Sequence, residues 1–446
     1  MQVPEQVKAV MDRLSAAGHD CYLVGGCVRD WLLGRRPHDY DLATDATPQQ
    51  VMDLFEKTAP TGLRHGTVMV LFPGGQVEVT TFRREGRYSD SRHPDEVQFV
   101  QTVEEDLARR DFTINAMAWN PGRGLVDPFG GRRDLEQGLI RAVGDPVQRF
   151  EEDALRMVRA FRFAARLGFT IEPATRNAVD VCQDRIRFVA VERLVPEWME
   201  ILRTDPLRLQ DMTGLFAPWI PELEQAAQTP QHSPYHYAGV LRHILDSIRY
   251  LDPFDETAAL ALLLHDLGKP ETRTTSPGGR DHFKGHPVAG QAIARRVVEA
   301  LKLPARQKKV IPELVLHHDD ILPRNLETIY RLRVTEGWSD EWVQLLFRVQ
   351  YCDIMAHSEK GRQRLERLEA SRAFYEEQIR FRPLSLQELA IDGHDILTYT
   401  GLRNRQVRQA LETVLEYAFH HPEKNNRLDL LTFVLRSMPR LEGAGS

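Results

Sequence analysis

The chain has 446 residues, 42% of them hydrophobic and 27% charged, which is long enough for roughly two to four globular domains. Its net charge of −6 argues against a uniformly basic nucleic-acid-binding protein, so any RNA contact must come from local arginine clusters. Four scattered cysteines indicate neither a disulfide framework nor a zinc knuckle, and no apolar run reaches the length of a signal peptide or a membrane span. We therefore expect a soluble, cytoplasmic protein without membrane contact.

The first informative stretch follows an amphipathic helix expected at residues 3–18 and reads CYLVGGCVRDWLLGRRPHDYD, from Cys21 to Asp41. An apolar run meets Gly25-Gly26, a helical segment follows, and two aspartates end the stretch. This pattern predicts strand, glycine turn, helix and strand. If Asp39 and Asp41 both lie on the last strand, their side chains point the same way, about 6–7 Å apart. Two such carboxylates can hold a pair of Mg²⁺ ions.

The glycine turn has a matching chemical use. Without Cβ atoms, Gly25 and Gly26 let backbone amides at a helix start approach phosphate oxygens, and Arg29 adds a charge-assisted contact. Alone, a Gly-Gly pair is more often a plain turn, and an Asp-x-Asp is more often a solvated or capping pair. Together they favour nucleotidyl transfer.

The segment GGCVRDWLLGRRPHDYDLAT resembles the signature of the class II tRNA nucleotidyltransferases, the family of CCA-adding enzymes and bacterial poly(A) polymerases in the polymerase β-like superfamily. The resemblance implies an α+β fold, in which a polymerase β-like head with a mixed sheet and helices is followed by all-α neck, HD and tail domains. We expect the catalytic head at 1–142, a helical neck with a template for the nucleotide base at 143–225, an HD metal-dependent phosphohydrolase domain at 226–365, and a tRNA-binding helical tail at 366–446.

The rest of the head extends the resemblance. Residues 64–83 predict a β-hairpin, on which Glu78 is the family's candidate for a third catalytic carboxylate; an exposed strand glutamate is the alternative. The polar residues 84–96 predict a mobile loop of the kind that, in the family, separates enzymes adding the terminal A from those that stop after two Cs. RRDFTINA matches the second family motif, so Arg110 is expected at the triphosphate or ribose, with support from Asp111 and Asn115. The alternative is a surface salt-bridge cluster.

Residues 149–169 predict one amphipathic helix that ends at Gly168. Four polar residues recur along it at every third position, namely Asp153, Arg156, Arg159 and Arg162. Like charges at that spacing cost about 0.2–0.5 kcal/mol per pair, so we expect either an anionic or planar partner or intrahelical pairing with neighbouring acids. The resemblance implies that Asp153 and Arg156 read the Watson–Crick edge of the incoming base. Arg159 and Arg162 would support the nucleotide, and residues 188–203 would brace the helix.

Nine of the sixteen histidines lie between 232 and 357. Among them, HDLGK at His265-Asp266 is the hallmark of HD-type metal phosphohydrolases. Imidazoles with carboxylates suit Ni²⁺, Mn²⁺, Fe²⁺ or Zn²⁺, and a metal-bound water is a nucleophile for phosphoesters. The resemblance implies a ligand set of His243, His265, Asp266, His286, His317 or His318, and Asp353. A degenerate, structural module is the alternative.

The resemblance implies that the tRNA 3′-hydroxyl attacks the α-phosphate of CTP or ATP, adding C, C and A without a nucleic-acid template and releasing pyrophosphate. An A-adding-only enzyme and a poly(A) polymerase are the alternatives within the family. GLRHGTVMVLF, which stands where poly(A) polymerases carry an arginine-rich segment, favours the tRNA enzyme. An HD phosphohydrolase whose head only binds RNA is the alternative of another class. A homodimer is left open as the assembly state.

Overall fold

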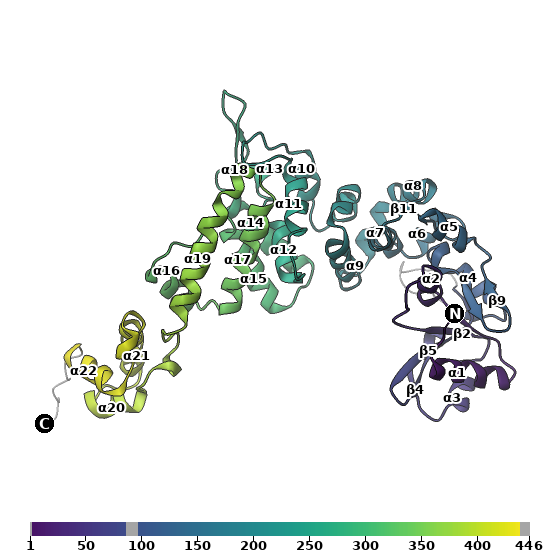
Figure 1. Ribbon diagram of the computed structural model, residues 1–446, viewed down its shortest axis with the longest axis horizontal. Helices are drawn as coiled ribbons and strands as arrows, with labels where there is room; N and C mark the ends of the chain where they lie inside the picture. The colour runs from purple at the N-terminus through teal and green to yellow at the C-terminus, as the bar shows by residue number, and fades with distance from the viewer. Residues whose placement is uncertain (1, 86–96, 438–446) are drawn as a thin grey trace. The chain divides into compact units, whose positions relative to one another are not determined.

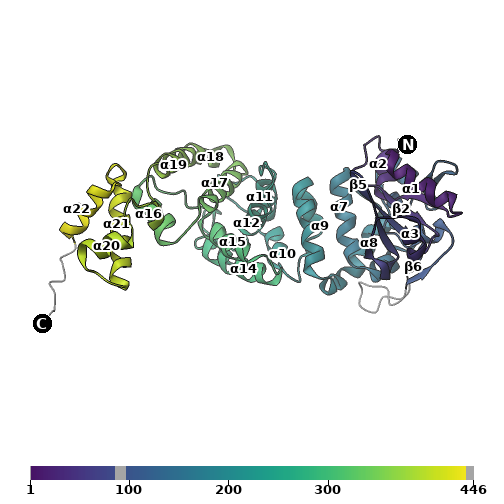
Figure 2. The same cartoon turned by 90° about the horizontal axis from the view of Figure 1, so that it is seen from below.

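A computed structural model describes residues 2–85 and 97–437, so most of the polar segment predicted as a loop lies outside the described residues. The chain forms two compact units, Met1–Glu224 and Gln225–Ser446 (Figures 1 and 2). The finer division into head, neck, HD and tail domains stays a prediction.

The first unit contains a seven-stranded sheet with the order β3-β4-β5-β2-β1-β8-β9. The strands are β1 (Cys21–Val24), β2 (Asp41–Thr44), β3 (Thr58–Gly62), β4 (Thr67–Phe72), β5 (Gly75–Thr81), β8 (Ala118–Asn120) and β9 (Gly124–Val126). β2 and β5 pair in parallel, whereas β1 with β2 and β4 with β5 pair antiparallel. The sheet is therefore mixed, as predicted, and β4 and β5 form the predicted hairpin.

Short helices pack on this sheet. They are α1 (Glu5–Ala16), α2 (Gly26–Leu32), α3 (Pro48–Leu54) and α4 (Val103–Ala108). The start of α3 follows from Thr47, whose side chain accepts the backbone N–H of Gln50 in a capping box. Val103 and Leu107 of α4 belong to the same hydrophobic core cluster as Tyr22 and Val24 of β1. The predicted order of strand, turn, helix and strand at 21–44 is confirmed.

The helices that follow the sheet are α5 (Gly131–Gln137), α6 (Pro146–Glu152), α7 (Leu155–Leu167), α8 (Pro173–Cys182) and α9 (Val191–Thr204). Two-residue strands β10 (Leu139–Ile140) and β11 (Thr170–Ile171) pair between them, and β6 (Arg83–Glu85) pairs with β7 (Val97–Phe99). α7 packs against α9 (Figure 2), and α6 packs against α8. The single helix predicted over 149–169 is wrong: α6 ends at Glu152 and α7 begins at Leu155, because Asp153 has an extended backbone with φ −143° and ψ 103°.

The second unit is built around α12 (Glu256–Leu264). Every residue from Ala258 to Leu264 is buried, which is expected of a helix that is apolar on all sides. α12 contacts α11 (Val240–Ile248), α14 (His286–Ala300), α15 (Ala305–His317) and α17 (Asp340–Met355). The other helices of this unit are α13 (Lys269–Thr272), α16 (Leu326–Tyr330), α18 (Glu359–Arg362), α19 (Arg364–Ile379), α20 (Gly393–Thr400), α21 (Arg405–His420) and α22 (Arg427–Ser437), with α10 (Glu222–Gln228) at the junction.

The helical prediction for the second half of the chain is confirmed, apart from one short pair of strands, β12 (Thr274–Thr275) and β13 (Asp281–His282). The last three helices have a hydrophobic core of their own, which includes Ile396, Val414 and Leu430. No helix in the described ranges is both long and apolar enough to cross a membrane.

Candidate functional site

Two acidic side chains meet on neighbouring strands of the head. Asp41, the first residue of β2, is the register partner of Glu78 on β5. Val77 and Val79 are buried, so Glu78 points to the opposite face, as the alternation of a strand requires. Asp39 lies two residues before β2 rather than on it, so the expected strand geometry for both aspartates is wrong.

The carboxylates influence one another electrostatically. Desolvation raises the pKa of Asp41; Arg110 opposes this effect and Asp39 adds to it. Desolvation also raises the pKa of Glu78, and the Asp41 carboxylate adds to that rise. Acidic groups whose charges disfavour one another fit a divalent cation, because the cation offsets the repulsion and oxygen ligands suit Mg²⁺. Asp41 and Glu78 therefore have the chemistry that the expected metal requires, although Asp39, Asp41 and Glu78 do not form a group of ligand atoms within 4.8 Å of one another in the described part of the chain.

The glycine turn leaves room for the side chain of Arg110 beside Gly25. Gly25 has φ +71°, and a Cβ built on it would lie 2.8 Å from Nη1 of Arg110. Both the backbone conformation and the close approach therefore require glycine at this position. Arg110 and Arg109 share the buried carboxylate of Asp106, so part of the surface salt-bridge alternative is realised, but at the edge of the site.

A chain of hydrogen bonds joins the two sequence motifs of the head to α7. Arg29 Nη1 donates to Oδ1 of Asn115 at 2.7 Å, and Nδ2 of Asn115 donates to Oδ1 of Asp111 at 3.1 Å. The other oxygen of Asp111 accepts from Nη2 and Nε of Arg159 at 2.6 and 2.9 Å. Burial opposes the charge of Asp111, but Arg159 outweighs it and lowers the pKa to about 2.

The break between α6 and α7 presents Asp153. Its carboxylate accepts the backbone N–H of Leu155 at 3.1 Å and pairs with Nη2 of Arg193 at 2.7 Å. Arg156 is 8% exposed and donates to the carbonyl of Arg109, and to Oε2 of Glu152, at 2.9 and 2.8 Å. Hydrogen bonds to backbone groups and to charged side chains thus fix the positions of Asp153 and Arg156 in the site.

The arginines of α7 find their counter-charges mainly on other elements. Besides its pairing with Asp111, Arg159 lies 3.5 Å from Glu197 of α9, and Arg162 also pairs with Glu197. The guanidinium of Arg162 stands over the ring of Phe163 at 4.1 Å. Anionic and planar partners therefore offset the like-charge repulsion on this helix, and the acid that pairs with Arg156, Glu152, belongs to α6 rather than to α7.

These side chains line one cleft of about 770 Å³. Every head and neck residue predicted for the site lines it except Asp39, whose charge still acts on Asp41. Among the described residues, its walls carry nine arginines, Arg29, Arg83, Arg109, Arg110, Arg156, Arg159, Arg162, Arg166 and Arg193, against four acids, Asp41, Glu78, Asp111 and Asp153. The lining of this cleft is therefore positively charged, although the chain as a whole has a net charge of −6.

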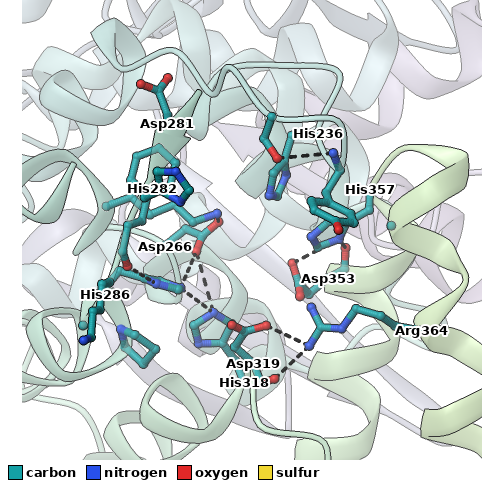
Figure 3. A pocket seen from close by; sticks show the side chains of 18 residues that line it. His236, Asp266, Asp281, His282, His286, His318, Asp319, Asp353, His357 and Arg364 are labelled. Carbon is teal, nitrogen blue, oxygen red and sulfur yellow. Dashed lines mark hydrogen bonds and ion pairs between the residues drawn. The ribbon is translucent and has the colours of Figure 1, made fainter. Parts of the chain in front are cut away.

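The second unit holds a separate pocket of about 360 Å³ (Figure 3). The predicted ligands converge at its base from the ends of α12 and α15, the start of α14, and from α11 and α17. Nε2 of His243 lies 2.8 Å from Asp353, and Nε2 of His265 lies 3.3 Å from Asp266. His318 belongs to this group, whereas His317 packs on the ring of Trp338.

The imidazoles are oriented as metal ligands are. Nδ1 of His265, His286 and His318 lies 2.6, 2.9 and 2.7 Å from a backbone carbonyl, which can only accept. Each Nδ1 is therefore protonated, and each Nε2 turns toward the pocket, the arrangement that fixes histidine ligands in metal sites. Nε2 of His265 and Oδ1 of Asp266 are buried without a hydrogen-bond partner, whereas Oδ2 of Asp266 pairs with Nζ of Lys269.

The charges of this pocket also fit a cation. Burial disfavours the charged form of His265, but Asp266 and Asp353 outweigh it and raise its pKa to about 10. Nε2 of His286 and Nε2 of His318 lie 3.2 Å apart, and two lone pairs at that distance repel unless a positive charge lies between them. The donor set thus fits a divalent transition metal.

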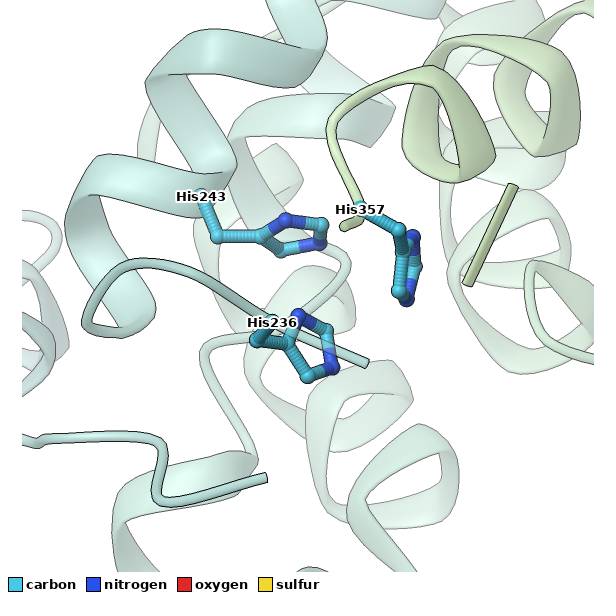
Figure 4. A group of neighbouring side chains, drawn as sticks. All are labelled: His236, His243 and His357. Carbon is cyan, nitrogen blue, oxygen red and sulfur yellow. The ribbon is translucent and has the colours of Figure 1, made fainter. Parts of the chain in front are cut away.

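Sequence reasoning missed several residues of the two sites. His236 and His357, which lie beside His243 (Figure 4), line the second pocket, and Lys269 is buried there with its Nζ 2.6 Å from Asp266. Burial, together with the nearby charge of Lys269, lowers the pKa of His236 to about 2. The sequence does not indicate the role of Glu197 in the first site, because its pairing with Arg159 and Arg162 depends on how α9 packs on α7. The histidine-rich composition was the available signal for His236 and His357.

The comparisons with known proteins match these two sites. Residues 21–141 match the poly(A) polymerase head domain, and residues 168–227 match a family described as the probable RNA and SrmB-binding site of polymerase A. Residues 234–442 match the HD domain. The CCA-adding enzyme of Anoxybacillus flavithermus is 48% identical over 222 residues, which is 49% of this chain and 56% of that protein. Over the matched residues, about half of its length, the chain is homologous to the CCA-adding enzymes.

Another CCA-adding enzyme, from Lactiplantibacillus plantarum, is 50% identical over 198 residues, or 44% of this chain and 49% of that protein. The sequence match therefore spans about half the length of the curated relatives. The solved structure of the Bacillus stearothermophilus CCA-adding enzyme in complex with CTP covers 98% of both chains with a TM-score of 0.70 at 29% identity. The Thermotoga maritima CCA-adding enzyme complexed with tRNA, at 20% identity and a TM-score of 0.58, shares the fold over 98% of this chain and 96% of its own.

Proposed function

We propose that the chain is a CCA tRNA nucleotidyltransferase, which adds C, C and A to the tRNA 3′ end from CTP and ATP without a nucleic-acid template. The observation that carries the proposal is the single cleft that collects Asp41 and Glu78, the glycine turn, Arg110, and the base-reading pair Asp153 and Arg156. The likeness to CCA-adding enzymes along the chain supports it.

In the proposed reaction the tRNA 3′-hydroxyl loses its proton to solvent, and its oxygen forms a bond to the α-phosphorus of the nucleotide. The bond between the α-phosphorus and the oxygen that bridges to the β-phosphate breaks, and pyrophosphate leaves. Asp39, Asp41 and Glu78 would hold Mg²⁺, which supplies activation of the hydroxyl and charge neutralisation of the triphosphate. Gly25, Gly26, Arg29 and Arg110 would bind the phosphates and ribose, supported by Asp111 and Asn115. Arg159 and Arg162 add positive charge beside them.

Base selection would fall to Asp153 and Arg156. A carboxylate accepts from an exocyclic amine and a guanidinium donates to a ring acceptor, a pairing that cytosine and adenine both offer. The hydrogen bond from the Leu155 amide and the ion pair to Arg193 support this role, because they fix the carboxylate of Asp153 before a nucleotide enters.

A second candidate activity belongs to the HD pocket. We place a divalent transition metal, Ni²⁺, Mn²⁺, Fe²⁺ or Zn²⁺, at His243, His265, Asp266, His286, His318 and Asp353, with phosphatase or cyclic phosphodiesterase chemistry. The carbonyl-anchored imidazoles favour this over a purely structural module. The carboxyl-terminal helices would bind tRNA, and the four buried, free cysteines favour the cytoplasm. A homodimer stays a prediction.

The test is single-turnover extension of three tRNA transcripts, which lack the whole tail, end in one C, or end in CC, with CTP and ATP supplied separately and together. Completion of CCA on all three is the expected result. Extension of the CC-ending transcript alone would make the protein an A-adding enzyme, and long A tails on unrelated RNA would make it a poly(A) polymerase. Absence of incorporation alongside phosphatase activity would favour an HD phosphohydrolase with an RNA-binding head.

A further inference from the structure

A second hollow of the first unit is a groove that shares no lining residue with the main cleft. It has a volume of about 720 Å³ and is lined by residues 2–4, Trp31, residues 34–37 and Tyr40. Among the described residues, its walls hold the rings of Trp31 and Tyr40 and two arginines, Arg35 and Arg36, but no acidic side chain. Aromatic rings beside arginines are typical of surfaces that bind single-stranded nucleic acid, where bases stack and phosphates pair with the cations.

The groove borders the proposed catalytic carboxylates. Residues 33–40 connect α2, which begins directly after the glycine turn at Gly25, to β2, which begins at Asp41. Tyr40 lines the groove, and the next residue, Asp41, lines the main cleft. Because consecutive Cα atoms are only about 3.8 Å apart, the two hollows meet at the start of β2. A strand whose end reaches Asp41 can therefore extend into the groove.

The turn at the end of α2 fixes the shape of the groove. The N–H of Gly34 donates to the carbonyl of Trp31 at 2.9 Å, and the N–H of Arg35 donates to the carbonyl of Asp30 at 2.8 Å. With Gly34 at φ +71°, these two bonds form a Schellman motif. The ring of Trp31 also packs against Trp119 of β8, with ring centroids 6.1 Å apart. The indole and the chain that leads to the arginines are thus positioned before any ligand binds.

The two arginines of the groove lack counter-charges within the chain. Arg35 and Arg36 are exposed, and neither side chain forms an ion pair or a hydrogen bond with another described residue. In the main cleft, by contrast, Arg110, Arg159 and Arg162 each pair with an acid. Arg35 and Arg36 can therefore pair with the phosphates of a ligand without first breaking an ion pair.

We infer that this groove binds the single-stranded 3′ end of the RNA substrate, with bases stacked on Trp31 and Tyr40 and phosphates paired with the two arginines. The inference rests on the proposed function, because it takes the tRNA 3′ end as the strand that reaches Asp41. A nucleoside triphosphate fits this groove less well, since the described walls carry no carboxylate for the metal ion that accompanies a triphosphate. A phosphodiester carries one negative charge, which a single guanidinium neutralises.

The experiment measures the Kd of the full chain for two labelled RNAs, a tRNA transcript without CCA and a short single strand of unrelated sequence, over a range of salt concentrations. The double variant Arg35→Gln, Arg36→Gln should raise both Kd values about fivefold or more and reduce the slope of log Kd against log salt by about 1.4, because two phosphate contacts are lost. Trp31→Leu should raise both Kd values similarly with an unchanged slope, because it removes stacking but no charge. The KM for CTP should stay within about twofold in both variants.

The matched control is the double variant Arg132→Gln, Arg133→Gln, which removes the same charge from another adjacent pair of exposed arginines, on α5. It should leave both Kd values within about twofold. Thermal melting checks folding, and the exposure of Arg35 and Arg36 keeps the test decisive if Trp31→Leu is unstable.

Unchanged Kd values in the Arg35→Gln, Arg36→Gln protein would overturn the inference, and so would an equal loss of RNA binding in the control. A raised KM for CTP or a lowered kcat with unchanged RNA binding would also overturn it, because the loop would then only position Asp41. Failure of the proposed function has a different signature. A protein that incorporates neither CTP nor ATP, but binds the single strand through Arg35 and Arg36, would refute nucleotidyl transfer and still support RNA binding in the groove.

Discussion

At the scale of single residues, the acidic side chains of the head cleft differ in whether their surroundings favour the ionised form. Asp41 and Glu78 are register partners on parallel strands, and desolvation raises the pKa of both; the charge of Asp39 adds to the rise at Asp41, and the charge of Asp41 adds to the rise at Glu78. Asp111, in contrast, has an arginine partner that makes its ionised form favourable. Removal of the Asp41 charge is therefore expected to leave the stability of the folded protein unchanged or to raise it, whereas removal of the Asp111 charge is expected to lower it.

Asp41→Asn should abolish nucleotide incorporation without loss of stability. Removal of a metal-binding carboxylate is expected to slow incorporation by about 10³-fold or more. A raised pKa means that the ionised carboxylate is less favourable in the folded protein than in the unfolded chain, so the metal-free variant should melt at the same or a higher temperature at pH 7. Single-turnover extension and thermal melting measure the two effects.

The control for Asp41→Asn is Asp53→Asn, because Asp53 is an exposed residue of α3 that bonds to Gln49. It should change neither quantity. Near-normal turnover of Asp41→Asn would remove Asp41 from the catalytic set, and a large loss of stability would show that the residue is needed for folding instead.

Asp111→Asn should change the acid side of the stability profile. With its pKa at about 2 against an ordinary value of 3.8, the ionised Asp111 stabilises the folded state above the ordinary pKa, and this contribution is lost as the pH falls from about 4 to about 2. A shift of this size corresponds to roughly 2 kcal/mol. Urea unfolding from pH 7 to pH 2 should show the variant less stable at neutral pH and the two proteins converging in acid. A gap that stays constant with pH would contradict the assignment.

At the scale of elements, the turns before helices decide where the functional side chains lie. The turn between β1 and α2 approaches Arg110 through Gly25, and the break between α6 and α7 presents Asp153. The alternation along β5 sends Glu78 to the face opposite Val77 and Val79. The site is thus assembled from element ends and strand register rather than from a continuous segment.

Gly25→Ala should weaken both folding and nucleotide binding. Alanine at φ +71° costs about 1 kcal/mol or more, and the added methyl group displaces Arg110 from its position. Gly34→Ala is the matched control, because Gly34 has the same φ of +71° but nothing within 4 Å of its would-be Cβ. The measurements are melting temperature and the KM for CTP. Both variants should lose stability, but only Gly25→Ala should show a raised KM; equal KM values would argue against the contact with Arg110.

At the scale of the whole molecule, two compact units carry two chemically different sites. The cleft of the first unit combines carboxylates with many arginines, which suits a nucleoside triphosphate with Mg²⁺. The pocket of the second unit combines imidazoles with buried carboxylates, which suits a transition metal. The residues that line each site all belong to one unit.

This separation predicts independent activities. Asp266→Asn should abolish metal-dependent hydrolysis of p-nitrophenyl phosphate or a 2′,3′-cyclic nucleotide, and it should leave incorporation of CTP and ATP within about twofold, because Asp266 lies in the second unit. Asp41→Asn should show the reverse pattern. Loss of both activities in either variant would show that the two units depend on one another. Hydrolysis that persists in Asp266→Asn would remove the HD pocket from this chemistry.

The sequence by itself determined the order of the elements in the head, the mixed-sheet fold followed by helices, and many of the residues that line the main cleft, although not Asp39 and not Arg83, Arg109 or Arg166. Local chemistry carries that information: strand alternation sets the face of Glu78, and Thr47 caps α3 through its own side chain. His265 and Asp266 were likewise readable, because they are adjacent in the chain and follow an apolar helix.

Only the tertiary structure decided the remaining features. Asp39 lies before β2, and Asp153 lies in a break rather than in a helix, because backbone pairing and the ion pair with Arg193 outweigh local periodicity. The choice of His318 over His317 depends on how the end of α15 is rotated against α12. His236 and His357 meet through packing of segments more than a hundred residues apart, a proximity that no local pattern encodes.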